Sequence, residues 1–245
     1  MLFIITFIII IIIYLFIFYN KKKENYNNKK KFYKIIFIVI ASDTDYYNKN
    51  KKILNKFMNS HKDVKTFYIY CNKKKLNNED NLYFDCNESL RPGILQKTIQ
   101  AFQYINKHYN YDYIIRTNLS TFWNINHLLQ RIQKLPKEKC LAGQKCRSFI
   151  SGTGIILSHD LVNILINDKN KLNYKNADDV EISHYLHNNY NIKYINEPRF
   201  DKYIKSTPKK KKSVPKHFTS FRVKTIKNRN LDSRKMFKLW NFLYT

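Results

Sequence analysis

The stretch Lys34-Ile-Ile-Phe-Ile-Val-Ile-Ala41 is a continuous apolar run that ends in Ser42-Asp43. A run without polar alternation is typical of a strand buried on both faces of a parallel sheet. Further predicted strands lie at 64–71, 82–85, 112–115, 139–143 and 192–195, and they alternate with predicted helices at 50–58, 92–105, 125–132 and 177–187. This alternation predicts an α/β sandwich of three layers with a mainly parallel sheet.

A second segment, Phe149-Ile-Ser-Gly-Thr-Gly-Ile-Ile-Leu-Ser158, holds two of the four glycines in the 245 residues. Glycine is favoured where the backbone takes unusual dihedral angles or approaches another molecule closely. The segment predicts a turn at 151–154, a buried strand at 155–157 and a helix that begins near Ser158. An ordinary tight turn without a binding role is the alternative.

Two carboxylates, Asp178 and Asp179, open the helix that follows the glycine segment. A carboxylate at such a place can act as a general base on a substrate hydroxyl. We expect Asp179 to be that base, with Asp178 or Glu181 as the fallback. The alternative role is structural, because acidic residues cap helix N-termini and stabilise the helix dipole.

The chain is strongly basic, with a net charge of +27 and a pI near 9.8. Such a balance would suit nucleic acid or an anionic membrane as a partner. Lys, Asn, Ile and Tyr are abundant along the whole chain, so we interpret the excess as a compositional bias rather than a binding patch. No specific nucleic-acid partner is expected, because no RNA- or DNA-binding motif accompanies the charge.

The first residues predict a membrane anchor. The segment 2–19 carries no charge and would be roughly 27 Å long as a helix, which is enough to cross a bilayer. We expect an uncleaved single-pass anchor at 1–19, a basic tether at 20–33 and one catalytic domain at 34–245. The lysines that follow the anchor favour a cytoplasmic domain under the positive-inside rule.

The cysteines leave the compartment open. Cys71, Cys86, Cys140 and Cys146 lack the paired spacing of a zinc site. Two disulfides would suit a lumenal domain, and four free thiols would suit a cytosolic one.

Three blocks of sequence carry a resemblance to a known family. They are Glu88-Ser-Leu-Arg-Pro-Gly-Ile-Leu-Gln-Lys-Thr-Ile-Gln-Ala-Phe102, then Tyr111-Asp-Tyr-Ile-Ile-Arg-Thr-Asn-Leu-Ser-Thr-Phe122, and then the glycine segment with Asp178-Asp179. In this order they resemble the β1,3-galactosyltransferase and Fringe glycosyltransferases, which have a GT-A (Rossmann-like) fold behind an N-terminal anchor. The resemblance implies a sugar transferase with a lumenal domain, a nucleotide-sugar donor and a glycan or protein acceptor.

The chain departs from that family at the metal motif. Where the family has Asp-x-Asp, this sequence has Thr117-Asn-Leu-Ser120. Neutral oxygens are poor substitutes for carboxylates in holding Mn²⁺ or Mg²⁺. We expect no metal site, although a divalent ion stays possible. In this respect the chain is similar to the core-2 branching and xylosyl transferases, which use basic side chains at the diphosphate.

The resemblance and the strand-end rule together give the expected site residues. The donor-binding candidates are Ser42, Arg116, Thr117, Asn118, Ser120, His217, Arg222 and Lys224. The acceptor-binding candidates are Ser151, Gly152, Thr153 and Gly154. For each basic residue, a solvated surface charge is the alternative.

We expect a membrane-anchored hexosyltransferase that moves a sugar by a single, inverting displacement without metal. Two rival functions stay open: a non-catalytic relative that binds a glycan or nucleotide sugar, and a basic membrane-tethered protein that binds nucleic acid or lipid. Formation of product would exclude the first rival, and a steep dependence of affinity on salt would identify the second.

Overall fold

The computed structural model describes residue 14 and residues 30–72 and 74–245. The predicted anchor at 1–19, apart from Tyr14, and most of the predicted tether at 20–33 lie outside these residues. Within the described residues, no helix has the length and apolar character needed to cross a membrane. The fold described below is that of the unit Phe32–Thr245, together with the first residue of its first strand.

A seven-stranded sheet in the order β3-β2-β1-β4-β7-β6-β8 forms the middle layer. Strand β1 pairs in parallel with β2, β2 with β3, and β6 with β8, whereas β7 runs antiparallel to both β4 and β6. The strands are β1 Lys31–Ile40, β2 Val64–Cys71, β3 Asn81–Phe84, β4 Tyr109–Asn118, β6 Leu141–Cys146, β7 Phe149–Ser158 and β8 Tyr194–Asn196.

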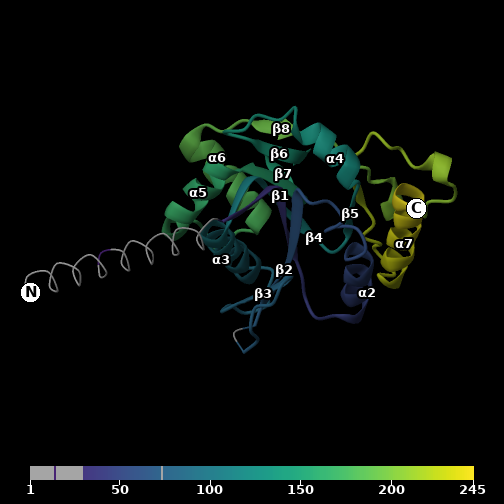
Figure 1. The fold of residues 1–245 in the computed structure, drawn as a ribbon, viewed down its shortest axis with the longest axis horizontal. Helices are drawn as coiled ribbons and strands as arrows, with labels where there is room; N and C mark the ends of the chain where they lie inside the picture. Colours follow the sequence, from purple (N-terminus) through teal and green to yellow (C-terminus); the bar gives the residue numbers. More distant parts are fainter. Residues whose placement is uncertain (1–13, 15–29, 73) are drawn as a thin grey trace, which may run out of the picture. The chain divides into compact units, whose positions relative to one another are not determined.

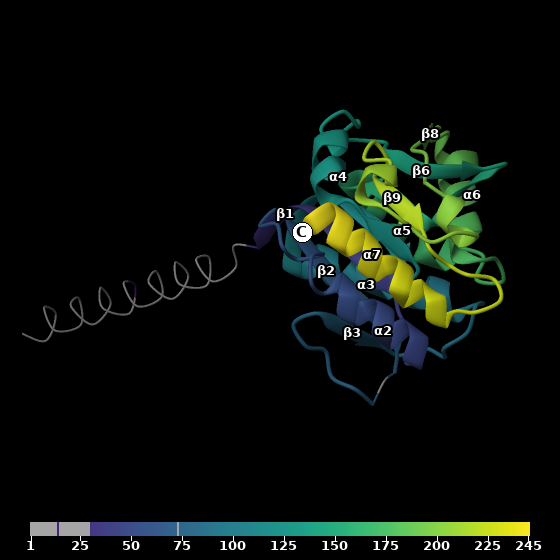
Figure 2. The same ribbon diagram turned by 90° about the vertical axis from the view of Figure 1, so that its right-hand side faces the viewer.

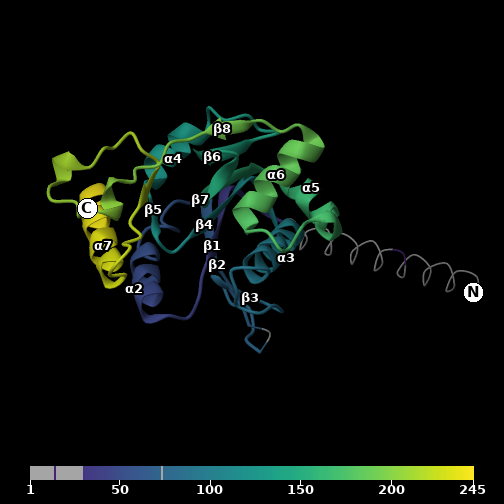
Figure 3. The ribbon, with the colours of Figure 1, turned by 180° about the vertical axis from the view of Figure 1, so that it is seen from behind.

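Helices cover both faces of the sheet, which confirms the predicted three-layer α/β sandwich (Figure 1). One face packs against α2 (Asp45–Leu54), α4 (Ile125–Ile132) and α7 (Asn230–Tyr244). The other packs against α3 (Gly93–His108), α5 (His159–Asn167) and α6 (Asp178–Tyr190), as the view from behind in Figure 3 also shows.

Strand β1 has the double burial that its sequence predicts. Ile35, Phe37 and Val39 lie in the core on one face, and Ile36 and Ile38 lie in the core on the other. All five are 0% exposed. Because successive side chains alternate between faces, only a strand covered on both sides can be apolar at every position.

The predicted turn at 151–154 is wrong. Residues 149–158 form the single strand β7, and the only glycine with positive φ in the described residues is Gly143, at 149°. Gly154 is needed for close packing instead, because a Cβ there would lie 2.7 Å from the Trp123 ring. The glycines of this strand therefore admit neighbouring side chains, and they do not serve a turn.

A small second sheet and the last helix were not predicted. Strand β5 (Thr121–Trp123) pairs antiparallel with β9 (Ser220–Arg222), and α7 packs along α2 (Figure 2). Several predicted boundaries also differ. Strand β1 begins at Lys31, so it includes the last residues assigned to the tether, and α2 spans Asp45–Leu54 and not 50–58.

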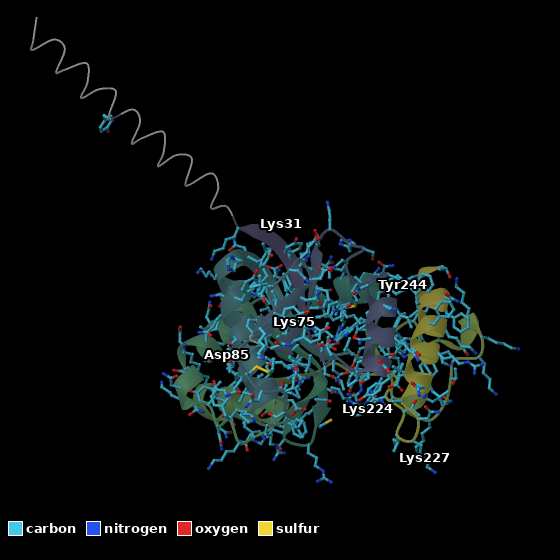
Figure 4. The ribbon with its side chains drawn as sticks, turned by 90° about the horizontal axis from the view of Figure 1, so that it is seen from below. Lys31, Lys75, Asp85, Lys224, Lys227 and Tyr244 are labelled. Atoms are coloured by element: carbon cyan, nitrogen blue, oxygen red, sulfur yellow. A yellow bond between two sulfur atoms is a disulfide. The ribbon has the colours of Figure 1, made fainter. Side chains whose placement is uncertain are left out.

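The cysteines are neither all paired nor all free. Cys71 and Cys86 form a disulfide that joins the end of β2 to the segment after β3; it appears as the yellow bond near the labelled Asp85 in Figure 4. Cys140 is buried and free, and Cys146 is half-buried and free. Burial raises the pKa of the Cys140 thiol to about 12, which makes it an inert core residue.

Candidate active site at the strand ends

A cavity of about 610 Å³ lies at the carboxyl ends of β1 and β4. The start of β7, the N-terminus of α6, the entry to α3 and the segment after β9 complete its wall. The predicted site residues that line it are Ser42, Arg116, Asn118, Ser120, Ser151, Gly152, Thr153, Asp178, Asp179, Arg222 and Lys224. The strand-end rule therefore brings together residues that lie far apart in the sequence.

The reversed direction of β7 explains why the glycine segment reaches this cavity. Gly154 pairs with Thr117 in the antiparallel ladder, so the residues before Gly154 continue past the carboxyl end of β4. Helix α6 packs against β7 and brings its first turn to the same place.

Arg116 and Asp178 form a buried ion pair. Arg116 donates through Nη2 to Oδ1 of Asp178 at 2.8 Å, and its Nε lies 2.7 Å from Oδ2. The two side chains are 6% and 4% exposed. Burial raises the pKa of Asp178, and the Arg116 guanidinium opposes that rise. Both residues border the cavity, but each is occupied by the other, so Asp178 is poorly placed to act as a base.

Gly152 joins this pair to Asp179. Its N–H donates to Oδ2 of Asp179 at 2.9 Å, and its carbonyl accepts from Nη1 of Arg116. A Cβ at this position would lie 2.6 Å from Nη1 of Arg116 and 3.0 Å from Oδ2 of Asp179. Glycine is thus required because a guanidinium and a carboxylate converge on its main chain.

Asp179 has a carboxylate that faces the cavity and retains acceptor capacity. Oδ2 accepts from Gly152, and Oδ1 accepts from the Val180 N–H at 3.0 Å. Each carboxylate oxygen has a second lone pair that these bonds leave open. The N-cap residue of α6 is Ala177 and makes no side-chain cap. Asp179 lies in the first turn, so it both favours the helix dipole and remains available to a ligand.

Glu181 is not at the site, although it was expected as a fallback base. Its Oε1 accepts from the Asn173 N–H at 2.8 Å and its Oε2 from Nδ2 of Asn176 at 2.7 Å. These bonds hold the loop before α6, and Glu181 does not line the cavity. Glu181 lies two residues after Asp179, a rotation of about 200° around the helix, so its carboxylate points to the loop and away from the cavity.

The residues at the degenerate motif do not fit a metal ion. Oδ1 of Asn118 accepts from the Ser120 N–H at 3.0 Å, from Oγ of Ser120 at 2.9 Å and from Oγ1 of Thr121 at 3.2 Å. These bonds close the turn between β4 and β5 and occupy the oxygen that would replace a carboxylate ligand. Among the residues that the structure describes, no three His, Cys, Asp or Glu side chains are grouped so as to hold a metal ion, and Asp178 is engaged by Arg116.

Arg222 and Lys224 are the cations of this cavity that have no acidic partner. Within the described residues, neither side chain makes a hydrogen bond or salt bridge. Burial lowers the pKa of Arg222, with a further contribution from Arg199. Lys224 is more exposed, and partial desolvation together with the nearby Arg229 lowers its pKa. Asp201 opposes the shift of Arg222 and Asp232 opposes that of Lys224, but neither carboxylate forms a salt bridge with these two side chains, so the pair favours an anion.

Sequence reasoning missed a second ion pair in the wall. Lys97 is 1% exposed and donates to Oε1 and Oε2 of Glu88 at 2.9 and 2.8 Å, and to the Ala41 carbonyl at 2.9 Å. Burial lowers the pKa of Lys97, and Glu88 opposes this. Both residues belong to the first block of the family resemblance, so the signal was present without a role attached to it.

Three predicted site residues lie elsewhere. Thr117 is buried and donates to the Thr153 carbonyl at 2.6 Å, while it accepts from Nε1 of Trp123 at 3.1 Å. Gly154 packs on Trp123. His217 lies with its ring 4.4 Å from that of Phe218 and does not line the cavity.

Comparisons with known proteins support the fold. No protein-family model matches the chain, and no curated protein matches its sequence. The structure is similar to that of a glycosyltransferase involved in the glycosylation of the major capsid of PBCV-1, with a TM-score of 0.52, 10% identity, and 85% of this chain and 99% of that chain covered. An active-site mutant of LgtC gives a TM-score of 0.38 at 10% identity, over 86% and 96% of the two chains, which is too low to support an argument.

The chain therefore shares its GT-A-like α/β fold with a solved glycosyltransferase. At 10% identity this similarity shows the fold alone and does not identify a glycosyltransferase family. Because one fold hosts many functions, the activity must be argued from the cavity itself.

Proposed function

We propose that this domain transfers a sugar from a nucleoside-diphosphate donor to an acceptor hydroxyl. The observation that carries the proposal is the composition of the cavity. Two unpaired cations, Arg222 and Lys224, line the same cavity as the available carboxylate of Asp179. A transfer of this kind needs cationic groups for the leaving diphosphate and a base for the attacking hydroxyl.

The charge balance of the cavity supports a diphosphate. The other two cations of the wall are each neutralised by a carboxylate partner. Arg222 and Lys224 remain, and their two positive charges match the two negative charges of a sugar diphosphate diester. The negative charge of an anion bound beside them would oppose the lowering of the pKa of both groups.

The proposed reaction is a single displacement. The acceptor hydroxyl approaches along residues 151–153, and Asp179 accepts its proton as the oxygen bonds to the anomeric carbon. The bond from that carbon to the diphosphate breaks on the opposite face, and the electron pair leaves with the diphosphate oxygen. Arg222 and Lys224 stabilise the developing charge. Attack opposite to the leaving group inverts the anomeric centre.

The proposal does not use a metal ion. The three hydrogen bonds that Oδ1 of Asn118 accepts favour a cation-based mechanism. The cationic side chains would supply the stabilisation that a divalent ion supplies in other transferases.

We also propose that residues 1–19 anchor the protein and that the domain lies on the oxidising, lumenal side of the membrane. The Cys71–Cys86 disulfide supports that side, because disulfides persist in oxidising compartments. Mass spectrometry after alkylation of the denatured, unreduced protein should find two modified cysteines. Four modified cysteines in protein from the native membrane would contradict the proposal.

Binding and turnover test the proposed function. Calorimetry with UDP-, GDP- and CMP-sugars at moderate salt should find one diphosphate donor. Lys224→Ala should weaken its binding about tenfold, as expected for loss of a charge-assisted contact. Lys227→Ala is the matched control, because this lysine is exposed three residues away and does not line the cavity (Figure 4).

The rival functions give different results in the same experiments. A non-catalytic relative would bind the donor but form no product in hours with any acceptor. A nucleic-acid or lipid binder would lose affinity steeply as salt rises, because counterion release drives such binding. Equal effects of Lys224→Ala and Lys227→Ala would contradict the proposed donor site.

A further inference from the structure

Lys224 is held by the main chain on both sides, although its own side chain is exposed. The preceding residue, Val223, is buried and its N–H donates to the Ser120 carbonyl at 3.0 Å. The following residue, Thr225, donates its N–H to Oδ1 of Asp232 at 2.7 Å. The side chain of Lys224 is thus presented to the cavity from a segment fixed at both ends.

Two buried charged residues of α7 provide the second anchor. Asp232 is 0% exposed and Lys235 is 3% exposed. Lys235 donates through Nζ to Oγ1 of Thr225 at 2.9 Å and to the Tyr203 carbonyl at 2.6 Å. Buried charges are costly unless they are hydrogen-bonded, and here both of them bond to Thr225.

Asp232 also connects, through Arg229, to a second residue of the cavity wall. Its Oδ2 accepts from Nε of Arg229 at 2.7 Å. The Arg229 guanidinium lies 5.0 Å from the ring centroid of Tyr46 and 5.1 Å from that of Tyr47, and Tyr47 lines the cavity. One carboxylate of α7 thereby fixes Thr225 and, through Arg229, contacts the segment that follows β1.

We propose that Asp232 and Lys235 are positioning residues that hold Lys224 in the geometry needed to bind the donor diphosphate. They do not touch the cavity themselves and act through Thr225. The inference rests on the proposed function for the role of Lys224, but it adds a role for α7. Packing alone would not require charged residues on the buried face of this helix.

The test uses Thr225, because it is the link between α7 and Lys224. Thr225→Val removes the hydroxyl that Lys235 contacts and keeps the side-chain volume, whereas Thr225→Ser retains the hydroxyl. Calorimetry with inorganic pyrophosphate should show about tenfold weaker binding for Thr225→Val and near wild-type binding for Thr225→Ser. Asp232→Asn should weaken binding as well if the variant folds.

The matched control is a different contact of α7, made at its C-terminal end. Tyr244 donates through its hydroxyl to the Trp123 carbonyl at 2.9 Å and accepts from the Ile125 N–H at 2.7 Å. Tyr244→Phe should lower the melting temperature without changing pyrophosphate affinity. If Thr225→Val behaves like this control, with lower stability and unchanged affinity, the network serves only to pack α7 and the inference is overturned.

A second measurement separates this inference from the proposed function. The acylation rate of the Lys224 amine, measured by mass spectrometry relative to Lys227, reports its environment without any donor. We expect this ratio to change in Thr225→Val and to stay unchanged in Thr225→Ser and Tyr244→Phe. If wild-type protein binds no pyrophosphate but the ratio responds in this way, the donor site is wrong and the positioning is supported. An unchanged ratio in Thr225→Val overturns the positioning.

Discussion

Asp178→Asn and Asp179→Asn should change different properties, although the residues are adjacent. The first should lower the stability of the fold, and the second should remove turnover. Asp178 is buried against Arg116 with contacts of 2.8 and 2.7 Å. Removing its charge leaves the Arg116 guanidinium buried without a counter-ion, which costs roughly 3–5 kcal/mol of unfolding free energy. At roughly 2–4 °C per kcal/mol for a domain of this size, the melting temperature of Asp178→Asn should fall by roughly 6–20 °C.

Asp179→Asn should leave the fold intact and remove turnover. The amide oxygen of an asparagine can still accept the Gly152 N–H, so we expect a change of less than about 1 kcal/mol in stability. Loss of a general base should lower turnover by a factor of about 100 to 10,000. The assays are thermal melting and product formation with the donor found by calorimetry. A stable Asp178→Asn, or an Asp179→Asn with wild-type turnover, would refute the assignment.

Three further predictions follow from the same structure. Gly152→Ala should reduce both stability and turnover, because its methyl group would lie 2.6 Å from Nη1 of Arg116 and 3.0 Å from Oδ2 of Asp179. Overpacking of this kind costs about 1–3 kcal/mol of unfolding free energy. An unchanged melting temperature and unchanged kinetics would contradict the geometry. Turnover should persist in EDTA, since the oxygen at the degenerate motif is occupied; recovery only on adding Mn²⁺ to EDTA-treated enzyme would show otherwise. Hydrogen bonding from Lys171 holds the pKa of Asp168 at about 2, below its ordinary 3.8, so its stabilising contribution is present above pH 3.8 and is lost as the pH falls toward 2. The melting temperature of Asp168→Asn should depend less on pH in that window than that of the wild type, and parallel curves would contradict this pairing.

Much of the fold could be predicted because it follows from apolar runs. Strand β1 was predicted because a strand buried on both faces is apolar at successive positions. The helix at 125–132 was predicted because a helix buried on one side has apolar residues at helical spacing. Helix α7 was missed for a physical reason. Asp232 and Lys235 occupy its buried face, so charges interrupt the apolar spacing that would have indicated a helix.

The location of the candidate site could be predicted from the sequence, but the roles of its individual residues could not. Strand ends and motif order brought most candidates to one cavity. The sequence could not rank Asp178 against Asp179, because the difference lies in burial and in the position of Arg116 across the sheet. The role of Gly152 was also hidden, since its neighbours are close in space and distant in sequence.

The strand order leaves one edge of β1 unpaired during part of synthesis. The first strand of the described residues, β1, lies between β2 and β4 in the finished sheet. Its second edge has no neighbour until residue 118, the last of β4, has left the ribosome. An apolar strand with an open edge is a template for aggregation. Over the interval between the two strands, the nascent chain therefore carries an apolar edge that is open to pairing with other chains.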